Sequence, residues 1–206
     1  MNRLNIKIFT ILLSIFALPL SASAITAEQI LDKAAASLTS APSVSIKFTT
    51  SGSMGNSTGS ITMSGNKFTF TSGELSVWYN GSLQWALMRS AEEVSLTKPT
   101  ASELIESNPF AIITNHKKLY TAKLLDSANG NYRIRLTPKG RHGHLRTATI
   151  TIGSSNYAVK ALSATLNDNS SFNVKVTSTT KGKALPVSYF TFDAKAHPSI
   201  ELIDLR

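Results

Sequence analysis

The sequence of 206 residues contains no cysteine. No disulfide can cross-link the fold, and no thiol is present for nucleophilic catalysis or for lipid attachment behind a leader. The motifs of several enzyme classes are missing as well, because there is no GxSxG elbow, no HExxH pair and no Walker loop. We therefore predict a protein that is not an enzyme.

Long apolar runs are scarce, and the one that stands out lies at the N-terminus. Two basic residues lead into the apolar stretch 8–20, and small residues follow it up to Ala24. This arrangement is typical of a cleavable secretory leader, and the run is short for a membrane span. We expect residues 1–24 to be a signal peptide cleaved after Ala24, and residues 25–206 to form one periplasmic domain. An uncleaved anchor is the alternative.

Acidic residues are few, with 12 Asp and Glu against 21 Lys and Arg, for a net charge of +9. The basic residues are scattered along the chain, which indicates a solvated basic surface. A charge of this sign also suits anionic lipid head groups or an acidic partner. Because a secreted chain with no basic run is a poor match for nucleic acid, we exclude nucleic acid as a partner.

Residues with metal-binding or acid–base chemistry are sparse. His142 and His144 share a loop that holds Arg141 and Arg146 but no carboxylate, so we predict a solvated loop and no metal site. The adjacent pair Glu92-Glu93 would point to opposite sides of a strand and cannot act together. We find no catalytic constellation in the sequence.

What the chain does have is a series of short, one-sided strands. In the stretch Tyr132–Ile152, Tyr132, Ile134 and Leu136 point one way while Arg133 and Arg135 point the other. Strands with one apolar and one polar face belong to antiparallel sheets that cover something on one side. Comparable segments are expected at 44–50, 61–63, 68–70, 75–79, 83–88, 94–96, 119–125, 145–152, 159–166, 172–176 and 200–205.

Two helical segments accompany these strands, one before the first strand and one between two groups of strands. Thr26 and Gln29 form a capping pair ahead of apolar residues at helical spacing up to Leu38. Thr100 and Glu103 repeat the pattern before a short apolar insert that Asn108-Pro109 breaks. An apolar helical insert between two groups of strands is unusual for a plain sandwich, and we interpret it as a lid over the sheet.

Aromatic and apolar residues are concentrated on the strands and on this insert. An ordinary core is one interpretation of them. The other is the lining of a cavity for a hydrophobic ligand, since a curled sheet capped by short helices tends to enclose one. The predicted cavity residues are Phe48, Met63, Phe68, Phe70, Trp78, Trp85, Leu87, Phe110, Ile112 and Ile113.

The order of these pieces resembles the outer-membrane lipoprotein carrier family, the LolA family. The segments that carry the resemblance are LTPKGRHGHLRTATITI, the strand pair around Asn167-Asp168, WYNGSLQW, SNPFAII at 107–113, the FTF element at 190–192 and a terminal strand with Asp204. Together they span the chain after the leader. The fold that this resemblance implies is α+β and mainly antiparallel: an unclosed, half-open β-barrel with short helices forming a lid over an apolar cavity.

The resemblance also implies a function. Carriers of this family accept acylated lipoproteins from an inner-membrane lipoprotein-releasing transporter, shield the acyl chains and pass them to an outer-membrane acceptor. The resemblance implies that the carrier uses no cofactor, and we expect this protein to act in that way as a monomer. The alternatives are a carrier or sensor of another lipid or hydrophobic ligand on the same fold, and, less consistent with the missing motifs, a lipid hydrolase.

One departure from the family concerns the lid. Family members often place an arginine on the strand after the first hairpin, where it bonds the lid shut. The corresponding segment here, 61–67, contains no arginine, and Lys67 is its basic residue. Lys67 is the candidate substitute, but lysine lacks the planar fork of a guanidinium that can hold several carbonyl groups at once, so the control of the lid is an open question.

Overall fold

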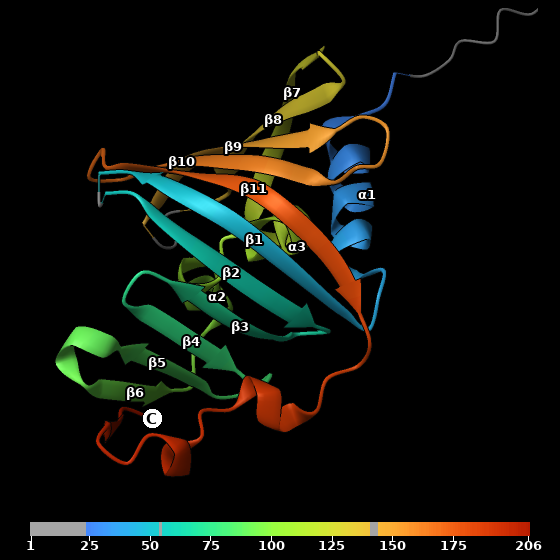
Figure 1. The fold of residues 1–206 in the computed structure, drawn as a ribbon. Coiled ribbons are helices and arrows are strands. Elements are labelled where there is room, and N and C mark those ends of the chain that lie inside the picture. Colours follow the sequence, from blue (N-terminus) through green and yellow to red (C-terminus); the bar gives the residue numbers. More distant parts are fainter. Residues whose placement is uncertain (1–23, 54, 141–143) are drawn as a thin grey trace, which may run out of the picture.

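The structure is a computed structural model, and it describes residues 24–53, 55–140 and 144–206 (Figure 1). Most of the predicted leader, residues 1–23, lies outside the described residues, as do Arg141, His142 and Gly143. Cleavage after Ala24 and the division into leader and domain therefore stay predictions.

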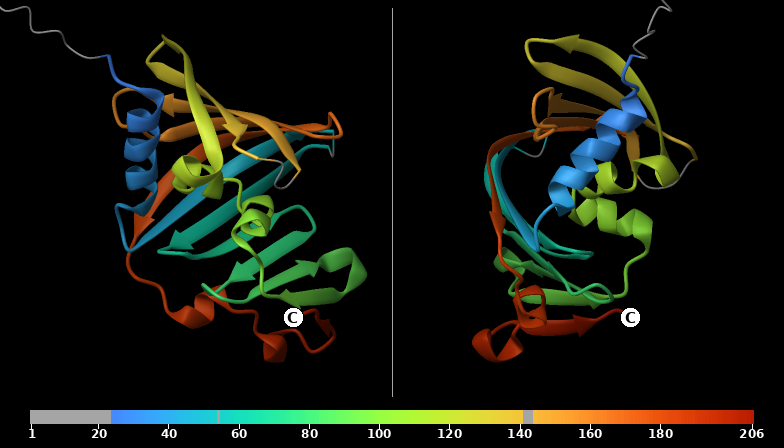
Figure 2. Two further views of the ribbon diagram at one scale, coloured as in Figure 1. Left: turned by 180° about the vertical axis from the view of Figure 1, so that it is seen from behind. Right: turned by 90° about the vertical axis from the view of Figure 1, so that its right-hand side faces the viewer.

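The first element is the predicted helix, α1 (Ala27–Thr39). Thr26 and Gln29 form the predicted capping box: the Gln29 N–H donates to the Thr26 hydroxyl at 3.2 Å, and the Thr26 N–H donates to Gln29 Oε1 at 3.0 Å. The buried face is the one that the apolar spacing predicts, with Ile30, Leu31 and Ala34 fully inaccessible. This face packs on the concave side of a large curved sheet (Figure 2).

One sheet of 12 strands makes up most of the molecule. Its spatial order is β12-β6-β5-β4-β3-β2-β1-β11-β10-β9-β8-β7, so β12 and β7 are the two edges, and the curved sheet stays open between them (Figure 1). This is the half-open barrel that the sequence predicts. The strands are β1 (Ser43–Gly52), β2 (Ser57–Ser64), β3 (Lys67–Ser72), β4 (Leu75–Tyr79), β5 (Gln84–Met88), β6 (Glu93–Thr97), β7 (Tyr120–Ala128), β8 (Asn131–Pro138), β9 (Leu145–Gly153), β10 (Val159–Leu166), β11 (Ser171–Gly182) and β12 (Glu201–Asp204).

Cross-strand register decides which side chains share the concave face. Phe48 lies opposite Gly59 and Val176, and Ile61 lies opposite Ile46 and Phe70. On the other half of the sheet, Ile150 lies opposite Ile134 and Leu162. Because neighbouring residues of a strand point to opposite faces, these rows form one continuous apolar surface. Most of the buried core lies there, together with the apolar face of α1.

Three short helices between β6 and β7 form the lid over this surface: α2 (Ala101–Ser107), α3 (Ala111–Thr114) and α4 (His116–Leu119). The second predicted capping box, Thr100 with Glu103, begins α2. Its hydrogen bonds hold the pKa of the Glu103 carboxyl below its ordinary value. Asn108-Pro109 separates α2 from α3, as the sequence predicts. Figure 2 shows the lid and α1 on the same side of the sheet.

The C-terminal segment was predicted less well. After β11, residues 183–200 cross to the far edge of the sheet and contain two short 3-10 turns, Val187–Phe190 and Ala194–Ala196. The last strand, β12, then pairs with β6 in parallel, whereas all the other pairings in this sheet are antiparallel. Strand direction at an edge depends on how the connecting segment returns, and local sequence patterns do not encode that route.

Candidate functional site: an apolar cavity beneath the lid

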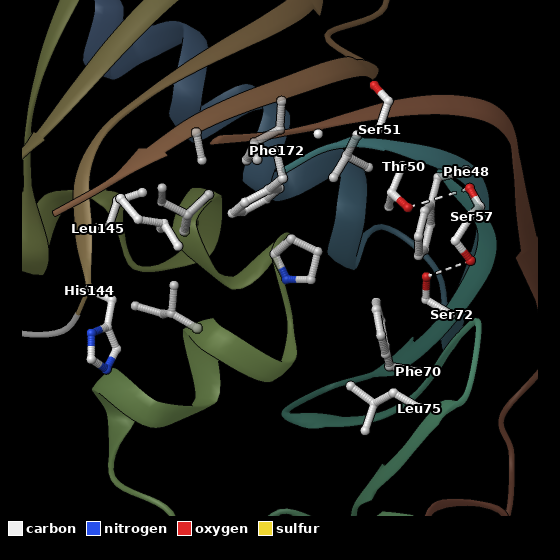
Figure 3. Close-up of a pocket in the computed structure, with 18 of the residues that line it drawn as sticks. Phe48, Thr50, Ser51, Ser57, Phe70, Ser72, Leu75, His144, Leu145 and Phe172 are labelled. Carbon is white, nitrogen blue, oxygen red and sulfur yellow. Dashed lines mark hydrogen bonds between the residues drawn. The ribbon is translucent and has the colours of Figure 1, made fainter. Parts of the chain in front are cut away.

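A cavity of about 900 Å³ lies between the lid and the concave face of the sheet (Figure 3). Its walls come from both halves of the sheet and from the lid. The apolar lining residues are Phe48, Phe70, Leu75, Met88, Ile105, Pro109, Ile112, Leu119, Tyr120, Pro138, Leu145, Leu162, Ala164, Leu166, Phe172 and Val174. A volume near the top of the usual range for small-molecule sites, with mainly apolar walls, suits a hydrophobic ligand.

An aromatic row links the sheet to the lid. The ring of Phe48 stacks on Phe70 with centroids 5.6 Å apart, and it meets Phe110 before α3 at 6.1 Å. The ring of Phe48 lies over Gly59, where a Cβ would stand only 2.5 Å from the ring carbons. Gly59 therefore lets Phe48 lie flat across β2, which brings its ring to the cavity wall.

The ten predicted cavity residues fall into three groups. Phe48, Phe70 and Ile112 line the cavity. Four others lie on the same side of the sheet but within the core around the cavity rather than on its wall: Met63, Phe68, Phe110 and Ile113. Whether the seven contact a ligand stays a prediction.

Trp78, Trp85 and Leu87 make up the third group, and the structure places them on the outer face of the sheet. Val77 and Tyr79 belong to the main core, so Trp78 between them points the opposite way. These three side chains form a separate cluster beneath the C-terminal segment, where Trp78 meets the ring of Phe192 at 5.4 Å. Their placement in the cavity was wrong because β4 and β5 carry apolar residues on both faces, which leaves the inward face undecided.

Sequence reasoning also missed half of the wall. Leu162, Ala164, Phe172 and Val174 on β10 and β11 line the cavity, as does Leu145 on β9. Their alternation was visible in the sequence and predicted their shared face. The pairing of β11 with β1, which brings that face opposite Phe48, joins residues more than 100 positions apart and has no local signal.

The rim of the cavity differs from one side to the other. On the side of β1 to β4 it carries hydroxyls and glycines, including Thr50, Ser57 and Ser72, which are linked by weak hydrogen bonds of 3.4 Å. On the side of α4 and the β8–β9 connection it carries Lys118, Lys139 and His144. Figure 3 shows His144 across the cavity from Phe70 and Leu75.

Asp32 on α1 forms one of the polar links between the lid and the rest of the molecule. One oxygen of its carboxylate lies 2.8 Å from Lys117 Nζ and 3.4 Å from His116 Nε2. His116 is buried, and its Nδ1 lies 2.7 Å from the Ile113 carbonyl oxygen. The Nε2 contact is close enough for an ion pair but is not aligned as a hydrogen bond. Asp32 thus connects α1 with α4.

A second link joins the lid to the sheet, where the Ser107 hydroxyl donates to Gln84 Oε1 at 2.7 Å. Lys67 does not take the place of the family's lid arginine. Its ammonium lies 5.9 Å from the ring centroid of Phe190 in the C-terminal segment, away from the lid. The lid is therefore held by residues other than those that the family resemblance suggested.

Titratable groups offer little acid–base chemistry at the cavity. Burial raises the pKa of the Tyr120 phenol above its ordinary value of 10.0, so this hydroxyl is neutral at physiological pH. Within the described ranges, no three His, Asp or Glu side chains lie close enough together to bind a metal ion. The mainly apolar walls suit the cavity to holding an apolar group.

An open half-barrel with a lidded apolar cavity defines a class of carrier and binding proteins. The sequence profile of the family described as outer membrane lipoprotein carrier protein LolA matches residues 13–167, which is most of the chain. The chain belongs to this family. No curated protein matches it.

Solved structures share the fold at low sequence identity. An uncharacterised conserved protein from Thermus thermophilus superposes with a TM-score of 0.58 at 8% identity, covering 86% of this chain and 98% of that one. A LolA superfamily protein from Nitrosomonas europaea (0.46; 16% identity; 82% and 99%) and a DUF1329 family protein from Desulfovibrio piger (0.49; 10%; 84% and 100%) are also similar. Of the three, the first shows a shared fold and no more than that.

Family and fold together describe a protein that binds a hydrophobic ligand or a lipoprotein. Members of this family act as carriers or binding proteins rather than as enzymes. None of the helices in the described part of the chain has the length and apolar character required to cross a bilayer.

Proposed function

We propose that this protein is a periplasmic carrier that takes acyl chains of lipoproteins into the cavity and moves them from the inner to the outer membrane. The observation that carries the proposal is the cavity of about 900 Å³, which is lined mainly by apolar side chains and covered by a separate lid. Each methylene transferred from water to such a site gains about 0.8 kcal/mol. A long acyl chain therefore crosses an aqueous compartment only when it is covered.

The size of the cavity limits how much it can cover. An apolar cavity of about 150 Å³ holds one benzene ring, or about 25 Å³ for each carbon atom. On this scale the cavity of about 900 Å³ has room for roughly 35 carbon atoms. This is enough for one or two long acyl chains, and a third would require the lid to move away from the sheet.

The lid supports loading and release because it is attached by few polar contacts. Asp32 holds α4, and Gln84 holds α2. Exposed ion pairs contribute about 0.2–1 kcal/mol each, so opening the lid would disrupt little polar stabilisation. The main cost of opening lies in exposing the apolar underside of the lid, and incoming acyl chains would cover that surface again.

Two measurements test the proposal. Native mass spectrometry of the protein purified from its own periplasm should show a co-purifying acylated protein. Addition of the purified protein to spheroplasts should release lipoproteins into the supernatant. Periplasmic location and an inner-membrane transporter as partner are also part of the proposal. Purification with no bound acyl compound, together with no release, would contradict it.

A point variant ties the activity to the cavity. Phe172→Glu places a carboxylate on the apolar wall, and we expect release and binding of an uncharged apolar dye to fall at least tenfold. Leu202→Glu on β12 is the matched control, because Leu202 is 48% exposed and lies outside the cavity. Equal loss in both variants would indicate misfolding rather than a blocked cavity.

A second candidate is a carrier of another lipid. It is favoured by the absence of the family's lid arginine and by the different contacts of Lys67. In that case native mass spectrometry should show a free lipid instead of an acylated protein, and spheroplasts should release no lipoprotein.

A further inference from the structure

The basic residues at the cavity rim are placed next to apolar wall residues in three separate segments. Lys118 precedes Leu119 at the end of α4, Lys139 follows Pro138 at the end of β8, and His144 precedes Leu145 at the start of β9. All six residues line the cavity. The same side of the rim thus offers an apolar surface inside and cationic side chains at the entrance.

The two lysines are brought together by backbone contacts. The Lys139 N–H donates to the Leu119 carbonyl at 2.9 Å, and Lys139 Nζ donates to the Lys117 carbonyl at 2.6 Å. The second of these bonds holds the Lys139 ammonium beside Lys117, the residue before Lys118. An ammonium has three N–H donors, and the bond to the Lys117 carbonyl uses one of them. The side chain of Lys118 is exposed at the same entrance.

The opposite side of the rim has a different character. It consists of Thr50, Ser51, Ser57, Ser72 and glycines, and Glu74 is the one acidic side chain among the described residues that line the cavity. The charge at the entrance is therefore polarised, with the cations on the side of α4 and β8. An elongated ligand with one charged end has a preferred orientation in such a site.

We propose that the cavity binds amphiphiles with an anionic head group, a carboxylate or a phosphate, and that Lys118 and Lys139 hold that head group at the entrance while the acyl chain occupies the apolar interior. This inference rests on the proposed occupancy of the cavity by acyl chains and adds the charge of the bound molecule. Ammonium groups beside a low-dielectric cavity attract an anion more strongly than they would in open water.

Competition against an uncharged apolar dye tests the proposal with acyl ligands of one chain length. The ligands are a fatty acid, the corresponding fatty alcohol, a lysophosphatidic acid and an alkyltrimethylammonium ion. We expect an anionic ligand to bind about tenfold more tightly than the alcohol and the cation to bind most weakly. A tenfold preference corresponds to about 1.4 kcal/mol. The fatty acid and the lysophosphatidic acid distinguish a carboxylate from a phosphate as the preferred head group.

The double variant Lys118→Gln/Lys139→Gln should reduce the preference for the anion to less than twofold and leave binding of the alcohol unchanged. The control is Lys123→Gln/Lys175→Gln, which removes the same charge from exposed positions on the outer face of β7 and β11. It should retain the preference. A second measurement needs no variant: raising the salt concentration should weaken binding of the anion but not of the alcohol.

Each outcome has a distinct meaning. Equal binding of anion and alcohol by the natural sequence, or a preference that survives the double variant, would overturn the role of the two lysines and leave the acyl cavity in place. Failure of every acyl ligand to displace the dye would overturn the proposed function itself.

Discussion

At Gly59, the absence of a side chain leaves space over β2 for the aromatic ring of Phe48. Any side chain at this position would occupy that space. A Cβ there would lie 2.5 Å from two ring carbons of Phe48 and 2.6 Å from the Thr71 carbonyl oxygen. The Thr71 backbone cannot shift as readily as a flexible side chain can, so the ring of Phe48 would have to move to make room for the Cβ. The position thus couples a core contact to the shape of the cavity.

Gly59→Ala should therefore lower the free energy of unfolding by about 1–3 kcal/mol, the usual cost of overpacking. Urea denaturation measures this change. Ser60→Ala is the matched control, since Ser60 is exposed on the other face of the same strand and should change stability by less than about 0.5 kcal/mol. A neutral Gly59→Ala would show that the Phe48 ring does not lie across β2.

Tyr120 gives the cavity wall a defined pH dependence. In the folded protein, burial raises the pKa of the Tyr120 phenol above its ordinary value of 10.0. Above pH 10 the unfolded chain loses this proton while the folded protein keeps it, so the unfolded state binds fewer protons and stability falls as the pH rises. Below pH 10 the group has no effect on stability.

Tyr120→Phe should remove this part of the alkaline destabilisation. Thermal unfolding between pH 8 and 11 should show the natural sequence losing stability more steeply than the variant above pH 10, with parallel curves below it. Phenolate absorbance at high pH should confirm that the residue titrates late. Identical slopes for the two proteins would mean that Tyr120 is hydrated.

At the scale of elements, α1 and the lid depend on one carboxylate. Asp32 is the ion-pair partner of both Lys117 and the buried His116. Asp32→Ala should destabilise the protein by up to about 1 kcal/mol, because it removes the exposed ion pair with Lys117 and the contact with His116 Nε2. Amide hydrogen exchange should accelerate in residues 108–119 while the strands remain protected.

Glu28→Ala provides the comparison, since Glu28 is exposed on α1 and has no ion pair in the described structure. Unchanged exchange in residues 108–119 of Asp32→Ala would show that the apolar contacts alone hold the lid. If the lid controls entry, Asp32→Ala should also load the apolar dye faster than the natural sequence does.

Local patterns predicted the elements well, because capping boxes and turns act over a few residues. Thr26 and Thr100 mark true helix starts, and Asn129-Gly130 forms the two-residue turn that its sequence indicates, with φ of 52° and 71°. Asn80-Gly81 does not form the two-residue turn that this dipeptide indicates. There the loop between β4 and β5 extends from 80 to 83, because the Asn80 side chain accepts hydrogen bonds from the Ser82 and Leu83 N–H groups.

Which side chains of a strand point inward was harder to predict than whether the strand exists. In β4, Val77, Trp78 and Tyr79 are all apolar, and the face that Trp78 occupies depends on a covering segment more than 100 residues later. The family resemblance supplied the half-barrel, and with it the cavity. It did not indicate the basic rim or the contacts of Asp32, which only the structure shows.

At the scale of the whole molecule, the C-terminal segment covers the cluster of Trp78, Trp85 and Leu87 on the outer face of the sheet, and it does not line the cavity. Phe192 packs on Trp78 and stacks on His197 at 5.2 Å. Phe192→Ala should cost about 3 kcal/mol in stability from the lost packing. Dye and acyl-ligand affinities should change less than twofold, because no residue beyond Val174 lines the cavity among those described.

Tyr189→Ala, which truncates a side chain that is 45% exposed, should leave both quantities unchanged. A large loss of affinity in Phe192→Ala would mean that the outer and inner faces of the sheet are coupled, and the separation of the two clusters would then be wrong.

The sheet consists of two runs of successive hairpins, β1 to β6 and β7 to β11, which meet where β1 pairs with β11. Each run forms from neighbours in sequence, but the seam joins Ser43–Gly52 to Phe172–Gly182. Such distant pairing makes folding slow, since the intervening chain must be ordered first. In the proposed export, β1 emerges early and keeps an unpaired edge until β11 has also crossed the membrane. A chaperone that covers that edge would protect the newly exported protein from aggregation.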